Sequence, residues 1–280
     1  MIEAPGYRRL FSGVFAALLP SKKKPVMKFK ISLVSFLLLV FPAYWVNGEG
    51  SLGGLQWDTT LPSLPDKHGF AGAFSGVSNG HLLVAGGANF PDAPPWQDGK
   101  KVWHDRIFSL HPEECEGGQG GKWVVAGKLP APSAYGASVS FANRVIFIGG
   151  DDGAKASNRV FSYAWDEKLS ELEEYPALPS ACTNLCAAVV KKGDGAVIYV
   201  ASGLSQLESQ SGQALKTFWS LELGPEGRPD PESGWKVLEP WPGPERFQAA
   251  SGVIDDEFYL FGGLRLQEGK LGSRVFPPLK

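Results

Sequence analysis

The chain has 280 residues, of which 35 are Gly and 22 are Pro, with 12% aromatic and 20% charged side chains. This high content of Gly and Pro argues against a helical protein and favours an all-β domain with a large apolar core. Residues 1–48 hold seven Lys or Arg and one acidic residue, so the rest carries 20 basic and 28 acidic residues, a net charge of −8. A domain this acidic is a poor nucleic-acid binder, so we expect no nucleic-acid partner.

Residues 27–48 resemble a secretory signal, with two lysines at the start, an apolar run and small residues at the end. The apolar run, Ile31 to Phe41, is shorter than the roughly 20 residues of a spanning helix. We therefore expect cleavage and export, to the periplasm or outside the cell, rather than a stable membrane anchor, which is the alternative. The preceding residues do not resemble a signal start, so we expect Met27 to be the natural first residue and residues 49–280 to be the exported domain.

Three cysteines are present, Cys115 alone and Cys182 and Cys186 four positions apart. An oxidising compartment permits one bridge, but an odd number leaves one thiol over. We favour buried, reduced side chains for Cys182 and Cys186, with a disulfide as the alternative. No His lies near this pair, so we expect no zinc site.

The stretch from Gly69 to Leu110 holds one complete unit of a pattern that returns along the chain. It begins with small residues and an Asn79-Gly80 turn, which between two apolar runs is a strong hairpin signal. An apolar strand, Leu82 to Gly87, ends in a double glycine. After a long polar excursion, a further strand is predicted at Trp103 to Leu110.

The double glycine marks an internal repeat with spacings of 63, 53 and 60 residues. A first strand and a tight turn precede each copy, and predicted third and fourth strands follow the first three. The fourth strands are expected at 122–130, 171–179 and 234–240, and the repeated pairs are Gly86-Gly87, Gly149-Gly150, Ser202-Gly203 and Gly262-Gly263. Four antiparallel strands per unit with this glycine pair predict blades of a kelch-type β-propeller.

The two ends of the array differ from the complete units. Residues 55–65 match the fourth strand of a blade, but no first three strands precede them. After Gly263 only 17 residues remain, which is fewer than a third and fourth strand require. We therefore expect three complete blades and half of a fourth, an incomplete propeller with two unpaired sheet edges.

The segments GFAGAFSGV, AGGANF, KKVWHDRIFSL and LPAPSAYGASVSFANRVIFIGGDDG closely resemble the cyclically permuted mutarotase family, kelch-repeat relatives of the N-acetylneuraminate epimerases. The resemblance runs from about Trp57 to Gly263. It implies a six-bladed periplasmic propeller whose central cavity binds sialic acid and speeds the exchange of its α and β anomers. It implies no metal or redox cofactor.

The family's proton acceptor is thought to be a Glu in a motif of the type NGE-x-KPG-x-RT, and this sequence contains no such motif. Glu268, in LQEGK, lacks the following Pro-Gly and Arg-Thr, so the role is not transferred to it and the catalytic residue is unassigned. We expect this chain by itself to be inactive as a mutarotase. The alternative is a non-enzymatic propeller that binds a carbohydrate or a protein.

Candidate substrate-binding residues follow from position, because inner-strand starts and the loops after the double glycines face the channel of a propeller. They are Asn89, Phe90, Tyr135, Asp151, Asp152, Asn184, Arg246 and Gln248. Arg246 is the leading candidate, because a guanidinium pairs with a sugar carboxylate in bidentate fashion. A brace at a blade junction is the alternative role for Arg246.

Other residues are expected to be structural. His104 and Asp105 resemble an acid–base pair, but adjacent strand residues point to opposite faces. Trp57, Trp123 and Trp235 open outer strands, where we expect packing between blades rather than a sugar platform. A copper oxidase of the same architecture requires a cluster of His and Tyr ligands. The four His residues all lie between positions 68 and 111, so we do not favour a copper site.

Overall fold

The computed structural model describes residues 61–111, 121–167, 169–207, 212–267 and 270–272, which belong to one compact unit, Gln56–Lys280. The predicted signal segment, Trp57, Cys115 and Glu268 lie outside the described residues. Apart from the 3-10 helix η1 at Pro95–Gln97, the regular structure of the described ranges is β. No helix in these ranges is long and apolar enough to cross a membrane.

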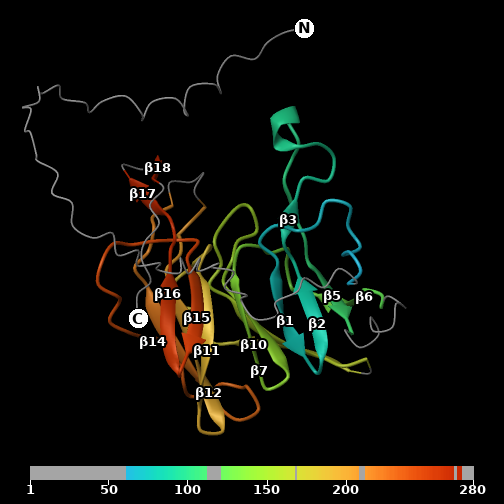
Figure 1. Ribbon diagram of the computed structural model, residues 1–280. Helices are drawn as coiled ribbons and strands as arrows, with labels where there is room; N and C mark the ends of the chain where they lie inside the picture. The colour runs from blue at the N-terminus through green and yellow to red at the C-terminus, as the bar shows by residue number, and fades with distance from the viewer. Residues whose placement is uncertain (1–60, 112–120, 168, 208–211, 268–269, 273–280) are drawn as a thin grey trace, which may run out of the picture. The chain divides into compact units, whose positions relative to one another are not determined.

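Three antiparallel sheets of four strands each follow one another along the chain (Figure 1). The first contains β1 (Phe74–Ser78), β2 (His81–Ala85), β5 (Arg106–Leu110) and β6 (Val124–Lys128). The second contains β7 (Ala137–Phe141), β8 (Arg144–Ile148), β9 (Val160–Trp165) and β10 (Ser170–Tyr175). The third contains β11 (Cys186–Lys192), β12 (Gly195–Ala201), β13 (Phe218–Leu223) and β14 (Lys236–Val237). In each, neighbours in the chain are neighbours in the sheet.

Three shorter hairpins complete the regular structure. One is the pair β15 (Ala250–Ile254) and β16 (Glu257–Phe261), which repeats the first two strands of a blade. The others are β3 (Ala88–Asn89) with β4 (Val102–Trp103), and β17 (Arg265–Gln267) with β18 (Lys270–Gly272). The prediction of an all-β, kelch-type propeller with three complete blades and the first half of a fourth is therefore confirmed.

Two details differ from the sequence-based expectation. Trp103 does not open the third strand of the first blade, which begins at Arg106; it pairs with Ala88 in the separate β3–β4 hairpin. The tail after Gly263, expected to contain no further strand, forms the β17–β18 hairpin. Both hairpins have strands of only two or three residues, too short to produce a clear alternating pattern.

Local sequence explains the tight turn inside each blade. Asn79 and Gly80 have φ of 47° and 80°, as a two-residue turn with left-handed central residues requires. Asp255 and Asp256, with φ of 50° and 60°, repeat this turn in the β15–β16 hairpin. Asn and Asp tolerate this conformation better than other residues that carry a Cβ.

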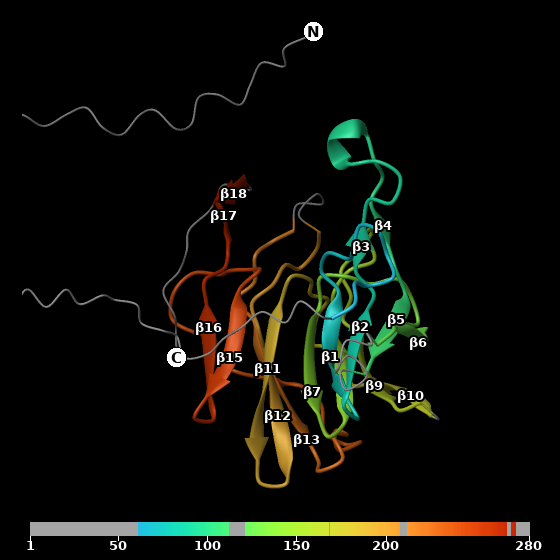
Figure 2. The ribbon, with the colours of Figure 1, turned by 45° about the vertical axis from the view of Figure 1, so that its right-hand side comes forward.

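The inner strands β1, β7, β11 and β15 lie side by side (Figure 2). Serine side chains connect them. Ser138 Oγ donates to the Ser75 carbonyl at 2.7 Å and accepts from the Ser75 amide at 3.1 Å, and Ser251 Oγ donates to the Ala187 carbonyl at 2.9 Å. The second blade and the β15–β16 hairpin therefore each satisfy backbone groups of the preceding inner strand.

The apolar core lies between the blades. Residues of the first and second blades, including Phe74, Ile107 and Phe147, form one buried cluster, and residues of the second and third, including Ile148 and Ile198, form another. Because both faces of the second sheet are covered, all five residues of β8 are buried. Burial of side chains of this size stabilises the fold by about 1.5–3 kcal/mol each.

Indole hydrogen bonds join Trp235 to the neighbouring blade, as expected, and Trp123 to the segment that precedes the first blade. Trp123 Nε1 donates to the Pro62 carbonyl at 2.9 Å, and Trp235 Nε1 donates to the Pro176 carbonyl at 2.8 Å. The segment that contains Pro62 thus has the same relation to the first blade as the end of the second blade has to the third.

An ion-pair network connects the outer strand of the second blade to a loop of the third. Arg144, whose side chain is 6% exposed, contacts Glu171 and Glu173. Arg228 contacts the same two carboxylates at 2.9 Å each. The hydrogen bond from Arg144, assisted by Arg228 and opposed by burial, lowers the pKa of Glu171.

Cys182 and Cys186 are buried and reduced, as favoured from the sequence. Cys182 Sγ lies 3.5 Å from the Ser202 carbonyl, which it faces as a weak donor. Burial, with a smaller effect of Cys186, raises the pKa of Cys182 to about 12.

Candidate functional site

Four residues with left-handed backbone form a row across the starts of the inner strands. They are Gly72, Tyr135, Asn184 and Gln248, with φ of 63°, 59°, 54° and 51°. The amide of Tyr135 donates to the Gly72 carbonyl at 2.8 Å, that of Asn184 to Tyr135 at 2.6 Å, and that of Gln248 to Asn184 at 2.9 Å. Side chains in this strained conformation are uncommon and gather at functional sites.

A second row of backbone hydrogen bonds runs beside the first. The amides of Gly87, Gly150 and Gly203, each the second member of a double-glycine position, donate to carbonyls of the next blade at 2.8, 2.9 and 3.0 Å. The acceptors are Ser133, Cys182 and Arg246. The loops after the double glycines therefore meet the inner-strand starts at the same end of the blades.

The structure brings Asn184 and Gln248 into contact with each other. Gln248 Nε2 donates to Asn184 Oδ1 at 3.2 Å, and Gln248 is exposed while Asn184 is half-buried. Tyr135, also half-buried, lies on the other side of Asn184 in the backbone row. These three candidates share one surface, and their part in substrate binding stays a prediction.

Asp151 is buried and its carboxylate is fully used by the protein. Oδ1 accepts from Trp103 Nε1 at 2.9 Å and from the Gly153 amide at 3.1 Å, and Oδ2 accepts from Thr183 Oγ1 at 2.6 Å. The side chain is thus directed into the protein, where it joins the first three blades. With 3% of the residue exposed, the geometry indicates an architectural role rather than direct sugar contact.

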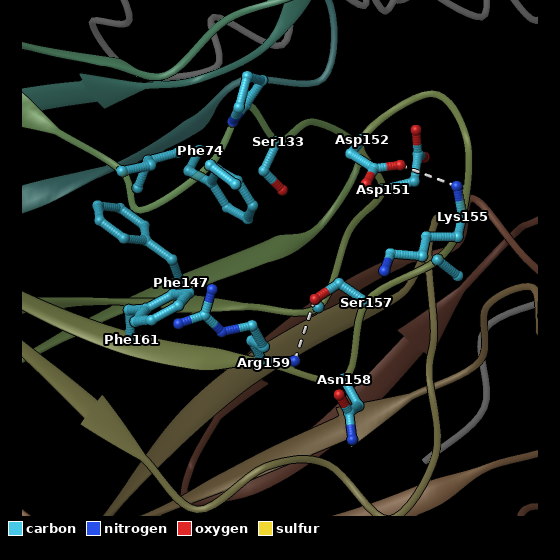
Figure 3. A pocket seen from close by; sticks show the side chains of 15 residues that line it. Phe74, Ser133, Phe147, Asp151, Asp152, Lys155, Ser157, Asn158, Arg159 and Phe161 are labelled. Atoms are coloured by element: carbon cyan, nitrogen blue, oxygen red, sulfur yellow. Dashed lines mark hydrogen bonds between the residues drawn. The ribbon is translucent and has the colours of Figure 1, made fainter.

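Asp152 is exposed at the edge of a hollow of about 320 Å³ between the first and second blades (Figure 3). Its Oδ1 accepts from the amides of Ala154 and Lys155 at 2.8 Å each. Burial acts to raise the pKa of Asp152, but these two amides and the charge of Lys155 outweigh it and lower the pKa. The carboxylate is therefore an anion that shapes its own turn.

Arg246 is 1% exposed and contacts the double glycine of its own blade, Gly262-Gly263. Its Nη1 donates to the Gly262 carbonyl at 2.9 Å, and the guanidinium carbon lies 5.7 Å from the centroid of the Trp241 ring. Burial lowers the pKa of Arg246, with a smaller opposing effect of Cys186. The contact with Gly262 lies within the blade of Arg246 itself and not at a blade junction, and a part of Arg246 in carboxylate binding stays a prediction.

Asn89, Phe90 and Tyr135 line a second hollow, of about 390 Å³, next to the β3–β4 hairpin. This volume falls in the range of small-molecule sites. Asn89 Nδ2 donates to Asp66 Oδ1 at 3.0 Å and to the Gly69 carbonyl at 2.8 Å. The amide of Asn89 therefore fixes the entry to the first blade, while Phe90 and Tyr135 offer ring surface to the hollow.

His104 and Asp105 have separate contacts, as expected for adjacent residues of an extended segment. His104 Nε2 lies 2.9 Å from Asn89 Oδ1. Because Asn89 Nδ2 already donates twice, its Oδ1 is the acceptor and His104 carries a proton on Nε2. Asp105 instead pairs with Lys128 at 3.6 Å.

Two residues that the sequence did not single out, Lys101 and Thr183, complete this region. Lys101 lines the larger hollow, with Nζ 4.3 Å from the centroid of the Tyr135 ring and 4.9 Å from that of Trp103. Thr183 binds Asp151, as described above. The available signal was the spacing of Lys101 and Trp103, which places both side chains on the same side of an extended segment.

Within the part of the chain that the structure describes, no group of three or more His, Cys, Asp or Glu side chains is placed to hold a metal ion. The side chains around both hollows are those of a binding surface: aromatic rings, amides and separate charges.

Residues 51–172 match the sequence profile of the N-acetylneuraminate epimerase family. The chain is 40% identical over 142 residues to N-acetylneuraminate epimerase of Haemophilus influenzae strain PittEE, a match that covers 45% of this chain and 36% of the relative. It is 36% identical over 143 residues to the Pasteurella multocida strain Pm70 protein of the same name, covering 44% and 36%. The match thus spans about a third of the length of these curated relatives.

The fold is similar to the solved structure of YjhT, with a TM-score of 0.55 and 17% sequence identity. This similarity covers 74% of the present chain and 62% of YjhT, and it supports the propeller architecture. The sequence match falls on the first two blades, and the structural match extends over most of the chain. Over residues 51–172 the chain is accordingly similar in sequence to the N-acetylneuraminate epimerases, on a kelch-type propeller fold.

Proposed function

We propose that the described blades bind N-acetylneuraminate as one part of a mutarotase propeller. The observation that carries the proposal is that the hollow is lined by residues of the segment that matches the epimerase family. The residues that line the hollow of about 390 Å³ lie between His68 and Tyr135, inside the segment that matches the epimerase family. The part of the chain most similar to the epimerases is therefore the part that forms this concave surface.

The chemistry of anomer exchange explains what else such a site requires. The proton leaves the anomeric hydroxyl, the bond between the anomeric carbon and the ring oxygen breaks, and the ring oxygen takes up a proton. The open keto form then closes again from either face. General acid–base help contributes about 10²–10⁴-fold only if the group is within reach of its proton.

Two acid–base groups close to the hollow, Asp151 and His104, are engaged by the protein. Both carboxylate oxygens of Asp151 accept hydrogen bonds, and His104 is bound to Asn89. The sequence also lacks the family's Glu-bearing motif. We therefore expect the 280-residue chain to bind the sugar acid weakly and not to accelerate anomer exchange.

NMR tests both parts of the proposal in one sample. Saturation-transfer difference spectra of N-acetylneuraminate with the purified chain should show contact, and N-acetylmannosamine, a neutral amino sugar, is the control. Magnetisation exchange between the anomers should keep the rate of the protein-free buffer. Fast exchange would mean that a proton-transfer group is present, and absence of saturation transfer to N-acetylneuraminate would contradict the binding proposal.

A non-enzymatic binding propeller is the second candidate, and the engagement of Asp151 and His104 favours it for this chain. It predicts saturation transfer to neutral sugars as strong as that to N-acetylneuraminate. A preference for the sugar acid favours the mutarotase-like site.

We also propose that the domain is exported. The support is the sequence of residues 27–48 and the net charge of −8 that remains without the leader. Expression in a bacterial host, followed by fractionation and N-terminal sequencing, should find the domain outside the cytoplasm with a first residue near Glu49. Retention of residues 1–26 on the exported protein would contradict this.

A further inference from the structure

We propose that Lys101 binds the carboxylate of the sugar acid, an assignment that rests on the binding function proposed above. Lys101 follows η1 and precedes β4, on the excursion that extends beyond the ends of β1 and β2 (Figures 1 and 2). It is half-buried and lines the hollow together with Asn89, Phe90 and Tyr135.

Two aromatic rings fix the position of the ammonium group. Nζ lies 4.3 Å from the centroid of Tyr135 and 4.9 Å from that of Trp103, both within cation–π range. Trp103 is itself held by its hydrogen bond to Asp151. The Tyr135 ring packs against Gly72, where a Cβ would lie only 2.5 Å from Cδ1 of Tyr135. The rings come from two blades, so the cation is placed at the junction between them.

The ammonium retains its capacity for an anion. The lysines in ion pairs among the described residues are Lys128, Lys192 and Lys236, each with a carboxylate within 4.0 Å. Lys101 is not one of them, and its Nζ lies over the two rings. Aromatic faces accept no N–H hydrogen bond of ordinary strength, so all three donors of the ammonium are available to a ligand.

The other polar groups of the hollow do not substitute for it. Asn89 uses both donors of its amide on Asp66 and Gly69, and Asp92, which also lines the hollow, is an anion. Among the described residues that line the hollow, Lys101 is the only Lys or Arg, and it is the cation that we assign to a carboxylate. A preorganised cation in a partly dry site binds an anion more strongly than a freely moving surface lysine does.

The test compares N-acetylneuraminate with its methyl ester, which has the same ring and no negative charge. NMR titrations are run on the unsubstituted chain, on Lys101→Met, and on Lys100→Met, which removes the same charge from the exposed neighbouring residue. The dissociation constant of the acid should rise about tenfold in Lys101→Met, the size of one charge-assisted hydrogen bond, and stay unchanged in Lys100→Met. The ester should bind the unsubstituted chain about tenfold more weakly than the acid and should not respond to Lys101→Met.

Each outcome decides a different point. Equal weakening of acid and ester by Lys101→Met would mean that the lysine only holds the two rings, and would overturn the assignment. Equal affinity of the unsubstituted chain for acid and ester would overturn it without any variant, and Lys101→Arg, which keeps the charge, should retain the preference for the acid. Binding of neither ligand would overturn the proposed function and the assignment together.

Discussion

Replacing the first residue of a double glycine should have very different effects at two equivalent places, Gly149 and Gly262. Both have left-handed backbone, with φ of 63° and 57°. A Cβ on Gly149 would lie 2.5 Å from the Cys182 carbonyl oxygen of the next blade, and a Cβ on Gly262 would have no heavy atom within 4 Å. Alanine at either position therefore carries the same backbone cost, but only one substitution crowds a blade junction.

The magnitudes follow from these distances. The left-handed conformation costs alanine about 1–2 kcal/mol, which is all that Gly262→Ala should lose. Gly149→Ala must also push away a carbonyl that accepts from Gly150 at 2.9 Å, at an overpacking cost of about 1–3 kcal/mol. Weakening that hydrogen bond adds about 1 kcal/mol. We expect a total loss of about 3–6 kcal/mol for Gly149→Ala.

Equilibrium unfolding in urea measures both losses, provided that the m-value is unchanged between variants. A useful third variant is Ser202→Gly, since Ser202 occupies this place in the third blade with φ of 63° and is buried. Ser202→Gly should be neutral or stabilising by up to about 1 kcal/mol. Glycine relieves the backbone strain of the left-handed conformation, but it loses more conformational entropy on folding than serine does. Equal losses in Gly149→Ala and Gly262→Ala would refute the argument that junction crowding requires glycine.

Two further predictions concern titratable groups. In a Cys115→Ser chain at pH 8, Cys182 and Cys186 should not react with a thiol reagent until urea unfolds the protein, because burial raises both pKa values; rapid labelling of the native chain would contradict this. Glu171 has a lowered pKa, so its contribution to stability is present above its ordinary value of 4.5 and is lost as the pH falls through the folded value. Since 45% of its side chain is exposed, that contribution is at most about 1 kcal/mol. Glu171→Gln should therefore be less stable than the unsubstituted chain at pH 6, and the difference in urea unfolding should shrink by pH 3; a constant difference would exclude the ionic contribution.

The repeated glycines predicted the order of the strands because Gly86 and Gly149 mark places where the backbone must approach the next blade. The carbonyl of Ser133 would lie 2.2 Å from a Cβ on Gly86, and that of Cys182 2.5 Å from one on Gly149. Such a steric requirement is local in sequence and therefore visible in it. The β3–β4 and β17–β18 hairpins were missed because a ladder of two or three residues depends on contacts rather than on pattern.

The sequence predicted where the candidate residues lie in the blades but not which of them are available to a ligand. Tyr135, Asn184 and Gln248 were placed correctly at the starts of inner strands, because that follows from the repeat. Whether a polar group is available to a ligand depends on partners far along the chain. Asp151 is occupied by Trp103, 48 positions before it, and Thr183, 32 positions after it.

The backbone row through Gly72, Tyr135, Asn184 and Gln248 has a consequence for how such a protein can change its ligand. The row itself is made of hydrogen bonds between main-chain amides and carbonyls, to which Gln248 and Asn184 add one side-chain contact. A residue at position 135, 184 or 248 that tolerates the left-handed conformation can therefore keep these backbone bonds, whereas a Cβ at Gly72 would lie 2.5 Å from Cδ1 of Tyr135. The side chains on this surface can thus change without loss of the backbone bonds between the blades. A library varied only at positions 135, 184 and 248 would therefore sample new binding surfaces on the same fold.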